Sequence, residues 1–281
     1  MKRLSLLLFL LISIAYSLDI TIKKSSVSNA RCFLLKSNED GSKYVAFEGK
    51  RYYFFPTKND FEHKFYVLVP VSYYSKPHRS KIVAVVVKNG KKLYKSFPVK
   101  IVDGKYKSEK LKVAPSKARF NKAQRARIAR ETKEAMKIYN TITPICYWNE
   151  PFSYPMNSKI TSQFGNKRVF NGSLKSYHSG TDFRAKTGTP IYATNRGKVV
   201  LVKNRYFAGN SVILDHGEGI YTGYYHMSKF KVKRGQIVEK GELLGLAGAT
   251  GRVTGPHLHF STRVAGVQVD PLQLLKLLNE I

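Results

Sequence analysis

The feature that most constrains the fold is a dense series of glycines between Gly197 and Gly255, which divides this part of the chain into short runs of β-branched and aromatic residues. Such runs predict strands, and glycines between them allow tight turns and close backbone approach. Strands are expected at residues 198–202, 211–214, 223–226 and 258–262. The carboxy-terminal part is therefore predicted to be an all-β structure that forms a groove.

Three imidazoles and one carboxylate fall in or just before this region. His257 and His259 can share one site, because residues two apart on a strand project from the same face. His178 and Asp182 are four residues apart, a spacing that aligns side chains on a strand or on a helix, and Gly180 between them favours extended or loop backbone. Neutral imidazole and carboxylate are ligands of catalytic zinc, which uses three protein ligands. Four candidates suggest three ligands and one base, although the spacing by itself leaves ordinary packing open.

The amino terminus has the three parts of a secretory signal: the basic residues Lys2 and Arg3, an apolar run over 4–16, and small residues up to Ser17. We expect export, with cleavage after Ser17. The apolar run is shorter than the roughly 20 residues that a bilayer span needs. No later stretch is long and apolar enough, so no transmembrane segment is expected in the mature chain.

The formal net charge is +31, which predicts association with a polyanion. Nucleic acid, anionic lipid and cell-wall polymers that carry carboxylates are the candidate partners. Export removes most intracellular nucleic acid, and the sequence contains no recognisable nucleic-acid reader motif. A nucleic-acid partner is therefore not expected.

The 281 residues divide into a predicted signal (1–17), an amino-terminal β domain (18–103), a basic helical connector (104–149) and a carboxy-terminal domain (150–281). Short β runs separated by turn residues predict a small sandwich-like domain over 18–103, in which His63 and His78 are surface or packing residues. A helix is expected at 121–139, more as a solvated connector than as a polyanion site. The leucine-rich tail 271–281 predicts a short closing helix.

Cys32 and Cys146 are the two cysteines. In an exported chain such a pair is compatible with a disulfide, and we expect one to form, with two buried free thiols as the alternative.

Residues 150–275 resemble the lysostaphin-like, LytM-type zinc metallopeptidases of the M23 class, which cut peptide bonds in peptidoglycan. The likeness lies in the spacing His178-x-x-x-Asp182 and in a series of short motifs that ends at His257-Leu258-His259. The motifs occur in 188–193, 197–199, 215–222, 225–228, 232–236, 241–245 and 248–251. The first 115 residues carry no such signature.

The resemblance implies a mainly β fold with an antiparallel β-sheet groove and a bound Zn2+. It implies that His178, Asp182 and His259 hold the metal, that His257 is the general base, and that His226 polarises the water or stabilises the oxyanion. His216 is interpreted as structural. Arg168 either meets a carboxylate of the substrate or decorates a loop.

We therefore expect an exported, periplasmic or wall-associated zinc hydrolase that cleaves amide bonds in peptidoglycan stem peptides or their cross-links. Endopeptidase and carboxypeptidase action both stay open. The alternative is a non-catalytic regulator that binds the wall or activates another hydrolase. The amino-terminal domain either occludes the groove or positions the protein on the wall.

Overall fold

The computed structural model describes residues 17–58, 60–111, 120–170 and 174–281. These residues form a mainly β protein with two helices, as the sequence predicts. The predicted signal sequence lies outside the described residues, apart from Ser17. Neither of the two helices has the length and apolar character needed to cross a membrane.

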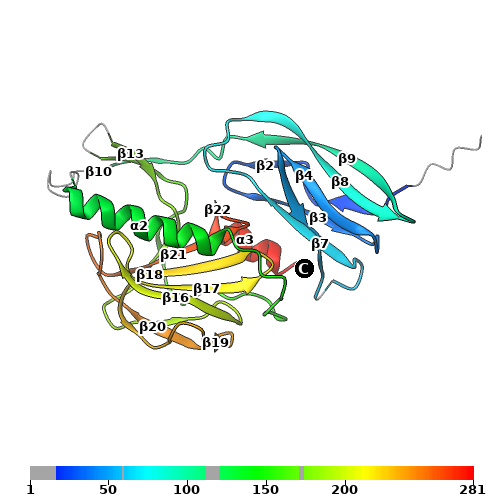
Figure 1. Cartoon of the computed structure of the whole chain (residues 1–281). Coiled ribbons are helices and arrows are strands. Elements are labelled where there is room, and N and C mark those ends of the chain that lie inside the picture. Colours follow the sequence, from blue (N-terminus) through cyan, green and yellow to red (C-terminus); the bar gives the residue numbers. More distant parts are fainter. Residues whose placement is uncertain (1–16, 59, 112–119, 171–173) are drawn as a thin grey trace, which may run out of the picture.

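The amino-terminal region is a sandwich of two sheets, with strand orders β1-β3-β7-β6 and β2-β9-β8-β4-β5 (Figure 1). Along β9, Phe97, Val99 and Ile101 are buried and the residues between them are exposed, so one face of this sheet lines the shared core. The predicted sandwich is confirmed. The strands are β1 (Ile20–Ile22), β2 (Ser26–Ser28), β3 (Cys32–Ser37), β4 (Ser42–Phe47), β5 (Lys50–Tyr53), β6 (Phe55–Pro56), β7 (Phe65–Pro70), β8 (His78–Lys88) and β9 (Lys91–Val102).

The sheet that contains β3 and β7 is covered on both faces. Phe33 and Leu35 face the sandwich core, whereas Leu34 and Leu68 belong to the larger core of the carboxy-terminal region. At the same junction the Tyr66 hydroxyl donates a hydrogen bond to the buried carboxylate of Glu218. Strands β3 and β7 therefore contribute side chains to both cores and join the two regions.

The carboxy-terminal region is built on an antiparallel ten-stranded sheet with the central order β11-β14-β21-β18-β17-β16-β19 (Figure 1). This confirms the predicted antiparallel β architecture. Its strands are β11 (Ile160–Ser162), β14 (Thr181–Arg184), β15 (Pro190–Tyr192), β16 (Gly197–Arg205), β17 (Gly209–Gly217), β18 (Ile220–Phe230), β19 (Ile237–Val238), β20 (Leu243–Ala247), β21 (His257–Val264) and β22 (Val267–Val269). A separate small sheet contains β10 (Ser108–Leu111), β12 (Lys167–Phe170) and β13 (Leu174–Tyr177).

Helix α2 (Lys122–Tyr139) begins at Asn121, whose side chain accepts a hydrogen bond from the backbone of Gln124 in a capping box. The predicted helix is confirmed, but it is not a fully solvated connector. Ala135 and Tyr139 pack on the ten-stranded sheet in a small cluster of their own, so α2 covers one face of that sheet (Figure 1).

Helix α3 (Pro271–Leu278) is capped by Asp270 and confirms the predicted closing helix. Leucines on α3 are buried in the larger core, and the Gln273 side chain bonds both backbone groups of Cys32 on β3. The carboxy-terminal helix thus ties the sandwich to the ten-stranded sheet.

The expected Cys32–Cys146 disulfide is wrong, because both thiols are free. Cys32 is buried in the larger core, and the Cys146 thiol donates to the carbonyl of Trp148 at 3.2 Å. Burial raises the pKa of the Cys146 thiol to about 12. Apolar packing therefore accommodates both cysteines as thiols.

Candidate metal centre

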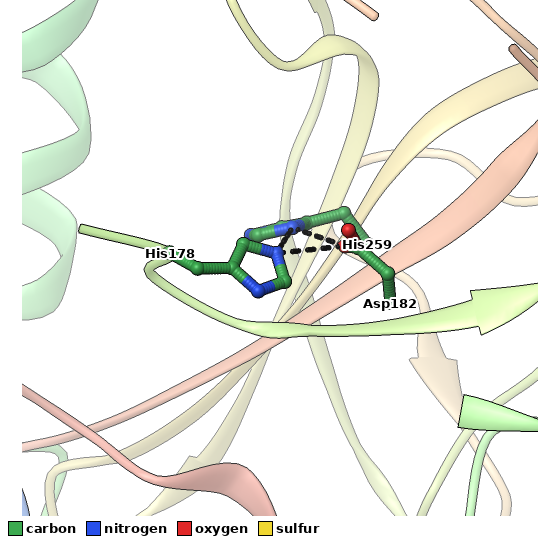
Figure 2. Close-up of side chains that lie close together, drawn as sticks. All are labelled: His178, Asp182 and His259. Atoms are coloured by element: carbon green, nitrogen blue, oxygen red, sulfur yellow. Dashed lines mark hydrogen bonds and ion pairs between the residues drawn. The ribbon is translucent and has the colours of Figure 1, made fainter. Parts of the chain in front are cut away.

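Three side chains from two neighbouring strands and the loop before them converge at one point (Figure 2). Asp182 lies on β14 directly opposite His259 on β21, and His178 lies in the loop that enters β14. His259 Nδ1 lies 2.8 Å from Asp182 Oδ1, and His178 Nε2 lies 2.9 Å from the same oxygen. The two imidazole nitrogens are 3.0 Å apart. The structure thus brings together the three residues expected to hold a metal.

Gly180 makes this convergence possible. A Cβ atom at this position would lie 2.6 Å from His259 Nε2 and would also collide with the carbonyl oxygen of Phe260. Any larger residue would push the loop that carries His178 away from β21, so the absence of a side chain is required for close approach.

The hydrogen bonds of His178 indicate which of its ring nitrogens is free to bind a cation. Its Nδ1 lies 2.8 Å from the carbonyl oxygen of Gln163, which can only accept, so Nδ1 carries the proton. In neutral His178 the Nε2 lone pair then faces Asp182 Oδ1, which is also an acceptor. A cation between these atoms relieves the repulsion, and two imidazoles with one carboxylate form the three-ligand set of a catalytic zinc site. The residues therefore fit zinc.

The electrostatics agree with this geometry. Burial opposes ionisation of Asp182, but the polar rings of His178 and His259 beside it outweigh burial and hold the pKa of the carboxyl well below its usual range. Burial also lowers the pKa of His259. One ionised carboxylate beside a neutral imidazole is the state in which both groups can donate electron pairs to a metal.

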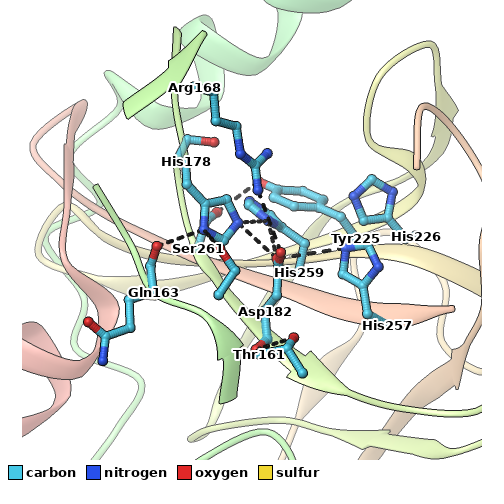
Figure 3. A network of polar contacts seen from close by, with 12 residues as sticks. Thr161, Gln163, Arg168, His178, Asp182, Tyr225, His226, His257, His259 and Ser261 are labelled. Carbon is cyan, nitrogen blue, oxygen red and sulfur yellow. Dashed lines mark hydrogen bonds and ion pairs between the residues drawn. The ribbon is translucent and has the colours of Figure 1, made fainter. Parts of the chain in front are cut away.

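His257 and His226 lie beside this cluster, with ring centroids 4.9 Å apart (Figure 3). The Nδ1 of His257 lies 2.9 Å from the Gly255 carbonyl, and the Nδ1 of His226 lies 2.9 Å from the Thr250 carbonyl. In each neutral ring the proton is therefore on Nδ1 and Nε2 is an acceptor. His257 Nε2 lies 3.7 Å from Asp182 Oδ1. Two proton acceptors thus accompany the three metal-binding candidates.

His226 reaches the cluster because β18 carries a bulge. From Asn210 to Val212 on β17 is two residues, whereas their partners Met227 and Tyr224 on β18 are three apart. The extra residue breaks the alternation of the strand, and His226 has φ of 63°, in the left-handed region. This strain places its ring on the same side as that of His257. Strand periodicity cannot reveal such a placement.

Arg168 lies over the cluster rather than on a peripheral loop (Figure 3). Its Nη2 is 3.7 Å from Asp182 Oδ2, the oxygen that does not contact the histidines. Neither alternative considered from the sequence anticipated this, because the ion pair depends on β12, which joins the small sheet by parallel pairing with β10. The sequence also did not indicate a role for Tyr225, whose ring stacks on that of His259 with the ring centroids 5.6 Å apart.

His216 lies outside the cluster. It is fully buried, its Nδ1 donates to the Arg196 carbonyl at 2.8 Å, and its Nε2 lies 2.8 Å from the Thr222 hydroxyl. Burial lowers its pKa to about 4. Both ring nitrogens are thus used within the sheet, in agreement with the structural interpretation.

The sandwich reaches the end of β13, directly before His178, through an aromatic cluster. The ring of Tyr73, which follows β7, stacks on Tyr177 at 3.7 Å with an interplanar angle of 8°, and its hydroxyl donates to the Gly165 carbonyl at 2.9 Å. The amino-terminal domain therefore supports the backbone that carries a predicted ligand. Occlusion of the groove by this domain stays a prediction.

The carboxy-terminal region of this chain is similar in sequence to known peptidases. The model of peptidase family M23 matches residues 176–271. Peptidoglycan DD-endopeptidase ShyA of Vibrio cholerae is 44% identical over 123 residues, which are 43% of this chain and 29% of ShyA. DD-carboxypeptidase/endopeptidase Mpg of Neisseria meningitidis is 36% identical over 125 residues, 44% of this chain and 28% of Mpg. This chain therefore spans less than a third of the length of either curated relative.

A crystal structure described as a candidate M23 peptidase of Pseudomonas aeruginosa resembles almost the whole chain. It superposes with a TM-score of 0.67 at 26% identity, and the match covers 88% of this chain and 94% of that one. The likeness therefore extends beyond the carboxy-terminal sheet to most of the chain.

Proposed function

We propose that this protein is a zinc-dependent hydrolase that cleaves amide bonds in peptidoglycan stem peptides or their cross-links, because residues 176–271 match the model of peptidase family M23. The observation that carries the proposal is the convergence of His178, Asp182 and His259, with His257 and His226 beside them. ShyA supports peptidoglycan as the substrate, because its name describes endopeptidase activity on this polymer, and the name of Mpg describes both carboxypeptidase and endopeptidase activity. The proposal covers endopeptidase action, which cuts an internal bond, and carboxypeptidase action, which cuts a terminal one.

His178 Nε2, Asp182 Oδ1 and His259 Nδ1 would hold the metal, since these three atoms face one another. When bound, zinc supplies Lewis acidity, which polarises a carbonyl oxygen and lowers the pKa of water. Arg168 contacts the outer oxygen of Asp182 and would hold the carboxylate in orientation.

His257 is the better general base of the two remaining imidazoles. Its side chain is 20% exposed, so water partly solvates the imidazolium that forms when the ring accepts a proton. His226 is buried, and burial together with the nearby His259 lowers its pKa to about 3. A neutral His226 with its proton on Nδ1 accepts a hydrogen bond at Nε2, which suits orientation of the attacking water. Stabilisation of an oxyanion would require the other tautomer or a protonated ring.

The charge of the chain supports a wall polymer as partner. A net charge of +31 raises the rate of encounter with a polymer that carries many carboxylates. Peptidoglycan lies outside the cytoplasm, so the proposal agrees with the predicted signal sequence and with an exported, periplasmic or wall-associated protein.

The decisive experiment is mass spectrometry of muropeptides before and after incubation with the zinc-loaded protein, with and without a chelator. We expect new products that reveal the bond cleaved, and loss of those products when the chelator is present. A zinc-loaded protein that leaves all muropeptides unchanged would refute the proposal and favour the wall-binding regulator.

Substitutions of the two histidines of β21 should have different effects on zinc binding and on cleavage. His259→Ala should lose both bound zinc and cleavage, whereas His257→Ala should retain zinc and lose cleavage by roughly a hundredfold or more, as expected for a general base. Zinc content is measured on the purified proteins alongside the muropeptide assay. His78→Ala, on the sandwich surface, is the matched control and should change neither. Unimpaired cleavage by His257→Ala would show that the base is assigned wrongly.

A further inference from the structure

The outer face of the β2-β9-β8-β4-β5 sheet carries a row of tyrosines in register. Tyr53 on β5 lies opposite Tyr44 on β4, Tyr44 lies opposite Val85 on β8, and Val85 lies opposite Tyr94 on β9. The row spans three strand spacings, about 14 Å. Tyr94 is 63% exposed and Tyr53 is 48% exposed, so their rings are available to a partner.

This face points away from the sandwich core. The alternate residues of the same strands, such as Val45 and Ala84, form the buried row that lies opposite the other sheet. In Figure 1, β8 and β9 lie on the side of the sandwich remote from the ten-stranded sheet and α2. Apart from its β5 end, where Tyr53 borders the junction with the carboxy-terminal region, the tyrosine row therefore belongs to a surface that the described fold leaves uncovered.

The charge on this face is of one sign. Five strand positions on it are basic and none is acidic: Arg51, Arg79, Lys81, Lys92 and Lys100. The guanidinium of Arg51 lies 4.9 Å from the centre of the Tyr44 ring. None of the five forms an ion pair with an acidic residue of the described parts of the chain. Exposed aromatic rings flanked by unneutralised cations favour a partner with apolar ring faces and negative charges.

We propose that this face, defined by Tyr44, Tyr53, Tyr94 and the five basic residues around them, binds peptidoglycan strands at a site separate from the metal centre. The apolar faces of sugar rings would stack on the tyrosines, whose hydroxyls remain hydrated. Peptide carboxylates would pair with the lysines and arginines. The inference rests on the proposed function only for its choice of polymer, and it gives the amino-terminal domain the role of holding the protein on its substrate.

An extended polymer fits the shape of the site better than a compact ligand. The row crosses four strands of an open sheet, and at its β5 end Tyr53 and Ile142 of the connector line the same small crevice. A chain lying along the row could therefore continue past the junction of the two regions. The exposed rings are tyrosines, which suit a hydrated glycan rather than the hydrocarbon interior of a membrane.

The test measures cosedimentation of the full chain with purified peptidoglycan sacculi. All binding samples carry His257→Ala so that the sacculi are not digested. Tyr53→Ala with Tyr94→Ala should weaken retention by roughly tenfold, because two stacking contacts together amount to about one decade in affinity. Lys81→Glu with Lys100→Glu should weaken it at low salt and less at high salt. This second variant keeps the test valid if the tyrosine variant folds poorly.

Matched controls alter the same chemistry elsewhere on the domain. Phe61→Ala removes a fully exposed ring outside this face, and Lys58→Glu with Lys64→Glu changes two exposed lysines that flank the paired strands β6 and β7 of the other sheet. The controls should retain binding. Equal loss in variants and controls, or full retention by both face variants, would overturn the proposal. So would tyrosine-dependent binding to phosphatidylglycerol vesicles without binding to sacculi, or a tyrosine-dependent dimer in sedimentation.

Failure of this proposal can be told apart from failure of the proposed function. With His257 intact, the Tyr53→Ala, Tyr94→Ala protein should cleave small soluble muropeptides at the rate of the parent, since these reach the metal centre directly. Absence of cleavage by the parent refutes the hydrolase. Loss of sacculus binding in the face variants supports the binding site whether or not the parent cleaves.

Discussion

Replacement of His216 by Gln tests whether burial of a neutral imidazole controls the acid stability of the ten-stranded sheet. His216 is fully buried, with hydrogen bonds to the Arg196 carbonyl and the Thr222 hydroxyl, and its pKa is lowered from 6.5 to about 4. Gln keeps a donor and an acceptor but cannot take up a proton in this range.

The direction in which stability changes with pH depends on whether the folded or the unfolded chain binds the proton on His216 more tightly. The folded pKa lies below the unfolded value, so the unfolded chain takes up a proton first as the pH falls, and stability is lost from about pH 6.5 downward toward pH 4. A shift from 6.5 to about 4 corresponds to a loss of about 2 kcal/mol by pH 5 and about 3 kcal/mol by pH 4. His216→Gln should lack this contribution.

The assay is urea unfolding of the parent and His216→Gln at a series of pH values from 7.5 to 5, compared as differences in the free energy of unfolding. At pH 7.5 the parent should be more stable, because Gln fills the site less well. The gap should narrow by about 2 kcal/mol at pH 5. His78→Gln is the control: His78 is exposed and its pKa is raised by bonds to the Lys76 carbonyl and Glu48, so its contribution is lost as the pH rises. A gap for His216→Gln that stays constant across this range would refute the reasoning.

Three further substitutions probe the supports of the site. Gly180→Ala should reduce zinc affinity and stability by about 1–3 kcal/mol, because the new Cβ collides with the backbone of β21 and lies 2.6 Å from His259 Nε2; zinc titration and thermal unfolding measure the two effects. Tyr73→Ala should destabilise the end of β13, next to His178, by about 2 kcal/mol, since it removes both the stack on Tyr177 and a hydrogen bond, and should speed amide hydrogen exchange there. Asn121→Ala should cost about 1 kcal/mol of stability through loss of the α2 cap, measured by urea unfolding.

Each of these has a matched control in the chain. Gly255→Ala meets no neighbouring atom within 4 Å and should be tolerated, so equal damage from Gly255→Ala and Gly180→Ala would contradict the steric explanation. Tyr73→Phe keeps the stack and loses only the hydrogen bond, and should lie between the parent and Tyr73→Ala. Asn121→Ser preserves the cap and should match the parent; a loss as large as that of Asn121→Ala would point away from capping.

The secondary structure that the sequence predicts well is encoded by local periodicity. Residues 121–139 contain good helix formers with no Gly or Pro, and α2 is Lys122–Tyr139. The β-branched run at 82–87 lies within β8. In contrast, β9 (Lys91–Val102) was not predicted, because the outward residues that alternate with Phe97, Val99 and Ile101 include Pro98, which is uncommon inside strands.

Some residues of the candidate site could likewise be predicted from local spacing, whereas others depend on tertiary contacts. The pair His257 and His259 follows from strand alternation, and both lie on β21 beside Asp182. His226 was assigned by family resemblance, yet its orientation depends on a bulge that only the pairing of β17 with β18 reveals. Arg168 was left between two alternatives, and its contact with Asp182 depends on a strand pairing across the chain.

The expected disulfide shows that the number of cysteines does not predict whether they pair. Two cysteines in a chain with a signal-like amino terminus made a bridge reasonable, but burial of Cys32 in a core shared by both regions leaves each thiol packed and free. Whether two side chains meet depends on the folded path between them, which a count of cysteines does not contain.

The sequence by itself determined the β character, the two helices and the residues able to bind zinc, because strand and helix periods and ligand chemistry act over a few neighbouring residues. Only the tertiary structure decided which atoms meet. Convergence of His178, Asp182 and His259 depends on the pairing of β14 with β21, on a glycine at position 180, and on Tyr73 of the sandwich, whose ring supports the end of β13 next to His178. These are contacts between residues far apart in the chain, and their distances are set by packing of whole sheets rather than by local spacing.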